Sequence, residues 1–231
     1  QIKAIDTPTF HFIYTTSNHS PYKIEDSLLD YDPATVMPHV GEDLRSNKTR
    51  NKELATYRYS DKALFSFVDS MKKAYPDSLF IITGDHSNLF GDLNNTSLIH
   101  RDYTLRDTFC TVALLQHPDL DSNMITTQKG THMSLMPTII EAIAPKGFEY
   151  YSITPSLFDD QPETLVTPYQ WITDSLMGDV RSDYGESNQP SAEPVTPIRP
   201  IDNHAKEARD WSLLTTWLIN HEEKLFSKKD D

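Results

Sequence analysis

The first half of the chain alternates between strand-like and helix-like spacings of apolar residues. Residues 9–16 are rich in aromatic and β-branched side chains and predict a strand. Ser60 is placed as an N-cap, and apolar residues at helical spacing after it predict an amphipathic helix over residues 61–75. Residues 78–83 form an almost continuous apolar run, which is typical of a strand covered on both faces. A strand, a helix and a strand in this order predict a right-handed βαβ unit and hence a parallel sheet.

Two further elements are expected before the pattern weakens. An apolar run predicts a third strand over residues 109–115, and Pro137 is well placed in the first turn of a helix through Ile143. Residues 23–56 are polar and irregular, so we expect a long loop there with a short helix near its end. The predicted fold class is therefore α/β, with a mostly parallel sheet flanked by helices.

The pattern divides the chain into four parts. Residues 1–150 carry the α/β pattern, and residues 151–184, where it weakens, are expected to form a C-terminal subdomain. Residues 185–203 combine several prolines with Ser, Asn and Gln, which predicts an extended connector. Residues 204–231 form the last part, in which helical spacing over residues 204–226 predicts a C-terminal helix.

Charge and cysteine content narrow the functions that this chain can have. The net charge of −13 repels nucleic acid and anionic lipid at long range, so no nucleic-acid partner is expected. A site for an anionic substrate would need a metal ion to reverse the local sign of the charge. The single cysteine, Cys110, excludes an internal disulfide and a cysteine-rich zinc site, and its apolar surroundings predict a buried thiol. No apolar run approaches the ~20 residues needed to span a membrane.

The pair Asp85-His86 is the strongest candidate for a chemical site. It follows a buried strand, and Gly84 at the strand's exit allows the sharp turn that would aim both side chains. Ligands of open α/β sheets bind beyond the carboxyl ends of the strands, so the pair is expected to bind a divalent metal ion. A carboxylate and an imidazole favour Zn²⁺ or Mn²⁺, with Mg²⁺ and Ca²⁺ as alternatives. The simpler interpretation is a loop cap, with the carboxylate accepting from turn amides and the histidine exposed.

Three other histidines lie where they could contribute. His19 follows the first predicted strand, so it is expected at the same edge of the sheet as His86, in contact with an anionic oxygen or a leaving group. His132 precedes the helix that begins near Pro137, and His100 lies in the polar loop after residue 86. Either could complete a phosphate pocket or a metal shell, and an exposed or structural role is the alternative for all three.

Three motifs in order resemble one known family. The run Phe-His-Phe-Ile-Tyr-Thr-Thr-Ser-Asn-His-Ser-Pro-Tyr, residues 10–22, resembles a strand and Ser-Asn-His-x-Pro-Tyr loop of lipoteichoic acid synthase-like sulfatase-family proteins, which belong to the alkaline phosphatase superfamily. Tyr-Ser-Asp at residues 59–61, followed by a strand into Gly-Asp-His, is similar to the same family. So is Met-Pro-Thr-Ile-Ile at residues 136–140, and the resemblance covers about residues 8–145.

The resemblance implies an alkaline-phosphatase-like fold, present here as a C-terminal part, and a mechanism. A Thr, or a formylglycine in true sulfatases, attacks phosphorus or sulfur with the help of divalent metal. Asp85 and His86 would be metal ligands, His19 a catalytic residue in contact with the substrate, and His132 a second one by a weaker match. The implied location is extracytoplasmic, in the periplasm or on the outer face of the cytoplasmic membrane, with membrane attachment only through segments outside this chain.

The sequence departs from the family pattern in three places. Ser87 stands where Gly or an aromatic residue is common, and Ser134 where Asp is common. The nucleophile and the remaining metal ligands of the family precede the Ser-Asn-His loop, and no Thr of this chain occupies that motif. The chain opens with Gln1 directly before a strand-like segment, so we expect a piece of a longer protein whose N-terminal half is its partner.

The leading functional hypothesis is a metal-dependent phosphotransferase or phosphodiesterase. Its anionic substrate would be a phospholipid or glycan with a phosphoglycerol or phosphoethanolamine head group. The first alternative is a sulfatase that hydrolyses sulfate esters, although Cys110 lacks the Cys-x-Pro-x-Arg pattern of a formylglycine precursor. The second is a degenerate, non-catalytic domain that binds a glycan or a partner.

Overall fold

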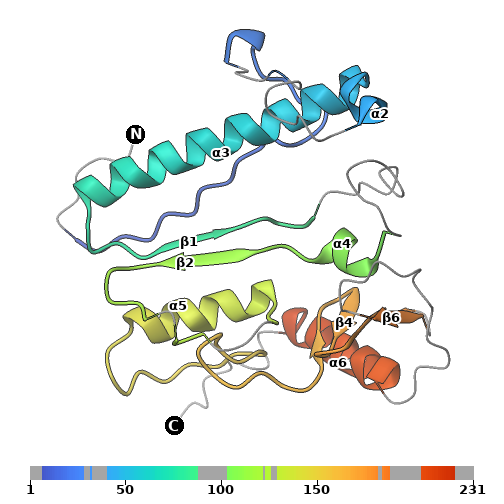
Figure 1. Ribbon diagram of the computed structural model, residues 1–231. Helices are drawn as coiled ribbons and strands as arrows, with labels where there is room; N and C mark the ends of the chain where they lie inside the picture. Colours follow the sequence, from blue (N-terminus) through green and yellow to red (C-terminus); the bar gives the residue numbers. More distant parts are fainter. Residues whose placement is uncertain are drawn as a thin grey trace. The chain divides into compact units, whose positions relative to one another are not determined.

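The computed structural model divides the chain into two compact units, each described by itself (Figure 1). The structure describes residues 7–28, 32, 41–87, 103–121, 123–125, 129–181, 184–187 and 204–221. Of these, the residues up to Ser78 belong to the first unit, and those from Leu79 onward belong to the second. No helix in these ranges is both long and apolar enough to cross a membrane.

One long helix dominates the first unit. After η1 (Asp26–Leu28) and α2 (Glu42–Arg45), the helix α3 (Lys48–Ala74) runs for 27 residues. Its N-cap is Asn47, whose side chain accepts a hydrogen bond from the backbone N–H of Arg50. The predicted start at Ser60 was wrong, because residues 48–59 contain good helix formers and neither glycine nor proline.

The segment 9–16 is extended but forms no strand in the structure, so the strand predicted there was wrong. Its large side chains are exposed, with Phe12 at 82% and Phe10 at 65%. A strand exists only when a neighbour completes its backbone hydrogen bonds, and this segment pairs with no strand in the described ranges. The side-chain composition of a segment does not determine whether another strand lies beside it.

The second unit begins with a two-stranded antiparallel ladder. In it β1 (Phe80–Thr83) pairs with β2 (Ala113–Gln116), so that Thr83 lies opposite Ala113. The mixed α/β character is confirmed, but every strand pair in the described ranges is antiparallel, so the predicted parallel sheet is not found there. The βαβ prediction needed a strand over residues 9–16, and β1 instead pairs with the strand that follows it in the chain.

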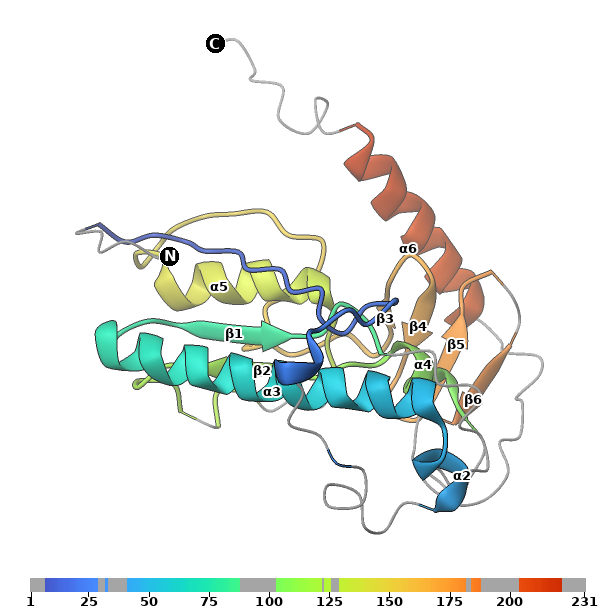
Figure 2. The ribbon, with the colours of Figure 1, turned by 90° about the horizontal axis from the view of Figure 1, so that it is seen from above.

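A short helix shifts the start of the third predicted strand. The helix α4 (Leu105–Phe109) begins at a capping box in which Thr104 and Asp107 satisfy each other's backbone N–H groups. The apolar run therefore enters the ladder only at Ala113. After β2, the turn η3 (His132–Ser134) leads into α5 (Leu135–Ile143), which confirms the helix predicted from Pro137 to Ile143. Figures 1 and 2 both place α5 beside the ladder.

The rest of the second unit is a small antiparallel sheet backed by a helix. The strands β3 (Leu165–Val166), β4 (Gln170–Ile172), β5 (Leu176–Asp179) and β6 (Gly185–Ser187) follow one another in chain order. The helix α6 (His204–Ile219) packs against β3 and β4 over a core of Trp171, Val180 and Ala208. The helix ends before residue 226, and β6 takes the first residues of the predicted connector, whose remainder lies outside the described residues.

Candidate functional site

The candidate metal pair lies in a tight turn at the end of β1. Gly84 opens this turn, and a Cβ atom added to it would lie 2.6 Å from Thr111 Oγ1. Such an approach is closer than real Cβ contacts, so a larger residue fits at this position only if Thr111 Oγ1 moves away. The turn therefore brings Asp85 and His86 out directly beyond the ladder.

Backbone hydrogen bonds orient both side chains of the pair. Asp85 Oδ1 accepts a hydrogen bond of 2.9 Å from the backbone N–H of His86. His86 Nδ1 lies 2.7 Å from the Ser87 carbonyl oxygen, which can only accept, so Nδ1 carries the proton. The neutral ring then presents the lone pair of Nε2, which lies 3.7 Å from Asp85 Oδ2. Both side chains are more than 60% exposed (61% and 64%), so this pair of atoms is open to a ligand.

This arrangement fits a divalent metal ion. Two ligands at about 2.1 Å from one tetrahedral ion lie about 3.4 Å apart, close to the observed separation of Nε2 and Oδ2. Metal-binding histidines commonly donate their second ring N–H to a backbone carbonyl, as His86 does to Ser87. A loop cap with an Asp85–His86 ion pair would also bring Oδ2 toward the imidazole, so the spacing agrees with both interpretations.

The pair supplies only two ligands. Within the ranges that the structure describes, no third His, Cys, Asp or Glu side chain joins it in a group able to hold a metal ion. A closed structural site needs four ligands, and a catalytic one commonly has three protein ligands and an open position. A complete metal site therefore needs further ligands in addition to this pair.

The predicted substrate-contacting residue His19 lies in the first unit, in a loop held by α3. Asn18 Oδ1 accepts a 2.6 Å hydrogen bond from the Ser60 hydroxyl, and the Tyr22 hydroxyl donates to the buried carboxylate of Glu53 at 2.7 Å. His19 itself is exposed, and its Nδ1 donates to the Ser20 carbonyl at 2.7 Å. Its Nε2 therefore remains available to a ligand. The expected proximity of His19 to His86 stays a prediction, since the two belong to different units.

His132 is oriented differently from the other two histidines. Its Nε2 lies 2.7 Å from the Gly84 carbonyl oxygen, so the structure brings it directly beside the turn that carries the metal pair. The sequence offered His132 as a residue that could complete a phosphate pocket or a metal shell, and it did not indicate a bond to the backbone. His100 lies outside the described residues.

Two supporting contacts of the turn were missed from the sequence. The Ser87 hydroxyl donates to the Asp107 carbonyl, and the Thr83 hydroxyl lies within hydrogen-bond distance of two carbonyl oxygens, that of Val112 at 3.0 Å and that of Gly84 at 3.1 Å. The Thr-x-x-Asp capping box at residues 104–107 is a signal that would have located α4 and hence this carbonyl. Ser134, which stands where Asp is common in the family, is fully buried.

Cys110 has the chemistry of a structural thiol. Its Sγ lies 3.9 Å from Met177 Sδ, and burial raises the thiol's pKa, against a smaller lowering by the Arg106 guanidinium. The thiol is therefore protonated at neutral pH and is a poor nucleophile. The side chain is half-buried, whereas the sequence predicted a buried thiol.

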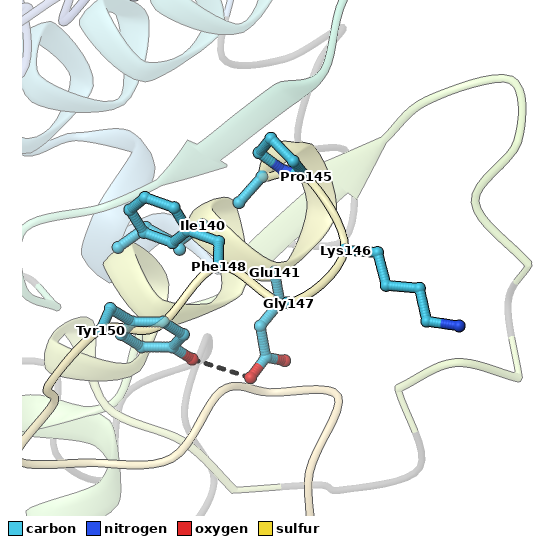
Figure 3. Close-up of a pocket in the computed structure, with 8 residues that line it drawn as sticks. Ile140, Glu141, Pro145, Lys146, Gly147, Phe148 and Tyr150 are labelled. Atoms are coloured by element: carbon cyan, nitrogen blue, oxygen red, sulfur yellow. Dashed lines mark hydrogen bonds between the residues drawn. The ribbon is translucent and has the colours of Figure 1, made fainter.

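A shallow depression of about 190 Å³ lies at the C-terminal end of α5, opposite the end next to His132 (Figure 3). The Tyr150 hydroxyl donates a 2.7 Å hydrogen bond to Glu141 there, while Lys146 points away from both. This bond raises the pKa of Tyr150 to about 12, chiefly because it stabilises the protonated hydroxyl and, to a smaller extent, because the Glu141 charge repels the phenolate. None of the predicted site residues lines the depression.

We predict that Glu141→Gln lowers the pKa of Tyr150 toward its ordinary value of about 10. Because the folded pKa is raised, the hydrogen bond stabilises the fold below pH ~10 and this stabilisation is lost as the pH rises through about 12. Tyrosinate absorbance should therefore show one group titrating earlier in Glu141→Gln than in the wild type. Tyr150→Phe, which removes that group from both curves, is the control, and identical curves for wild type and Glu141→Gln would contradict the assignment.

The described part of the second unit is mixed α/β and carries an exposed carboxylate–imidazole pair at a strand end. The Sulfatase family model matches residues 1–144, more than half of the chain, and the chain belongs to this family. The match confirms the sulfatase and alkaline phosphatase superfamily part of the resemblance and suggests an alkaline-phosphatase-like fold. It supports hydrolase-type or transferase-type activity on sulfate or phosphate esters. No curated protein sequence matches the chain significantly.

Proposed function

We propose that this protein is a metal-dependent phosphotransferase or phosphodiesterase of the lipoteichoic acid synthase-like type. The substrate would be a phospholipid or glycan bearing a phosphoglycerol or phosphoethanolamine head group. The observation that carries the proposal is the 3.7 Å separation of Asp85 Oδ2 and His86 Nε2, each side chain being held by a backbone hydrogen bond through its other polar atom.

Each residue of the proposed site has a distinct task. Asp85 and His86 hold the divalent ion, Zn²⁺ or Mn²⁺ in preference to Mg²⁺ or Ca²⁺. When bound, that ion neutralises the phosphate oxygens and activates a nucleophile. His19, when protonated, presents its Nε2–H to an anionic or departing oxygen, because its Nδ1–H is already donated to Ser20.

The proposed site is completed from outside this sequence. The nucleophile, a Thr in this proposal, and the remaining ligands come from an N-terminal half of the same protein. The site faces the periplasm or the outer surface of the cytoplasmic membrane, and membrane attachment comes only from segments outside these residues. A net charge of −13 disfavours nucleic acid as a partner.

Hydrolysis of sulfate esters is the second candidate, favoured by the description of the matching family. A non-catalytic binding domain is the third. It draws on two departures from the family pattern, since Ser87 and Ser134 do not offer the side chains common at these positions. The two alternatives differ from the proposal in the turnover they predict. A sulfatase would cleave sulfate esters faster than phosphate esters, and a binding domain would cleave neither.

A comparison of two chromogenic substrates tests the proposal. The full-length protein, loaded with Mn²⁺ or Zn²⁺, should cleave bis(p-nitrophenyl) phosphate faster than p-nitrophenyl sulfate, and EDTA should abolish the activity. Faster cleavage of the sulfate ester would replace the proposal with the sulfatase. Absence of stoichiometric metal together with absence of turnover would establish the binding domain instead.

A further inference from the structure

The imidazole of His132 forms a hydrogen bond with the backbone of the turn that carries Asp85 and His86. Its Nε2 donates to the Gly84 carbonyl at 2.7 Å and lies 3.4 Å from Thr83 Oγ1. His19 and His86 do the opposite, since each fixes Nδ1 on the carbonyl of the next residue and leaves Nε2 available. In His132 the Nε2 atom is therefore already used on the backbone, and a ligand could be contacted only through Nδ1.

This hydrogen bond restrains the backbone directly before Asp85. The Gly84 carbonyl and the Asp85 nitrogen belong to one planar peptide group, so holding the carbonyl oxygen also fixes the plane from which Asp85 extends. The ladder holds the chain on one side of this peptide through Thr83, and the Ser87–Asp107 hydrogen bond holds it on the other. His132 acts between these two points.

The element that carries His132 is itself firmly held. Ser134, at the end of η3, is fully buried, and its carbonyl accepts a 2.6 Å hydrogen bond from the Thr138 hydroxyl. The same hydroxyl accepts from the backbone N–H of Leu157 at 2.8 Å, which ties α5 to the following loop. Because η3 is held in this way, the Nε2–H donor of His132 can restrain the turn at Gly84. Residues that hydrogen-bond to metal ligands restrain those ligands in the same manner in known metal sites.

We propose that His132 is a positioning residue that holds the Gly84–Asp85 peptide so that Asp85 Oδ2 and His86 Nε2 converge on one metal ion. This role differs from the substrate contact expected from the sequence. It rests on the proposed function only in taking the pair as a metal site. The restraint on the turn exists with or without metal.

Two substitutions of similar size separate a positioning role from a simple packing role. In His132→Gln the side-chain amide can place an N–H donor near the position of the imidazole Nε2, whereas His132→Leu fills similar volume without a donor. In the full-length protein, His132→Leu should weaken the affinity for Mn²⁺ or Zn²⁺ by about 10- to 100-fold, measured by calorimetry. His132→Gln should stay within about threefold of the wild type. Equal losses in both variants, or no loss in either, would overturn the proposal.

A metal-free measurement keeps this test independent of the proposed function. The His86 amide donates to Asp85 Oδ1, so its hydrogen exchange reports on the closed turn. In metal-free protein, His132→Leu should accelerate exchange in a peptide spanning residues 84–87 and leave α6 unchanged, while His132→Gln restores the wild-type rate. A wild type that binds no metal but shows this pattern would refute the proposed function and retain the positioning role. Unchanged exchange in His132→Leu would refute the positioning role.

Discussion

Replacing Asp85 with asparagine should lower the turnover of the full-length protein by about 10³-fold, because a metal ion contributes several kcal/mol of transition-state stabilisation. Asparagine keeps the size of the side chain and an oxygen that can accept from the His86 N–H. It removes the negative charge that strengthens the binding of a divalent ion. Stoichiometric binding of Mn²⁺ or Zn²⁺ should fall in parallel with turnover.

This substitution separates the metal site from the loop cap. If Asp85 only caps the turn, asparagine serves nearly as well, and Asp85→Asn will retain both turnover and metal content. Asp119→Asn is a matched control, since Asp119 Oδ2 also lies near a histidine nitrogen, 4.0 Å from His117 Nδ1. There the imidazole Nδ1 accepts from the Asp119 backbone N–H, so it has no lone pair to give a metal, and the substitution should be silent.

Replacing Gly178 with alanine should destabilise the C-terminal sheet by about 3 kcal/mol, at the upper end of the usual cost of overpacking. Gly178 in β5 lies opposite Trp171 in β4, and an added Cβ would lie 2.3 Å from two atoms of the indole ring. Trp171 is completely buried against Val180 and Ala208, so the ring has no free space into which it can move. Urea unfolding followed by tryptophan fluorescence measures the loss.

A double-mutant cycle tests the cause of this loss. Trp171→Leu should destabilise the sheet by itself, but Gly178→Ala should then add little, because the clashing ring is gone. Gly130→Ala is the comparison, since the added Cβ would meet only the tip of the Leu157 side chain, which can rotate, and should cost less. Equal costs for Gly178→Ala with and without Trp171 would contradict the packing explanation.

Local signals predicted some elements and misplaced others. Pro137 and the apolar residues after it located α5, because helix initiation depends on residues within one turn. The start of α3 was missed, because Ser60 has the chemistry of an N-cap but uses its hydroxyl on Asn18, which is 42 residues away. The C-terminal sheet was also missed, because strands of two to four residues are too short to show an alternating pattern.

The pattern of apolar residues did not determine whether the strands pair in parallel or antiparallel. Composition indicated a strand over residues 78–83 that is covered on both faces; residues 80–83 form a strand, but none of them is buried. Whether a strand pairs in parallel or antiparallel depends on which segment completes its backbone hydrogen bonds, and that choice is made by tertiary packing. The extended segment 9–16 is rich in aromatic residues but pairs with no strand in the described ranges.

By itself, the sequence determined the family, through motifs of fixed order and spacing, and the location of Asp85-His86 directly after an apolar strand. Only the tertiary structure decided how these side chains are oriented, because the proton on each imidazole follows the hydrogen bond that its ring makes. His86 is oriented by its own neighbour Ser87, whereas the contact of His132 with Gly84 joins residues 48 positions apart. Such a contact exists only once η3 packs against the end of β1, which is why the role of His132 depends on the fold.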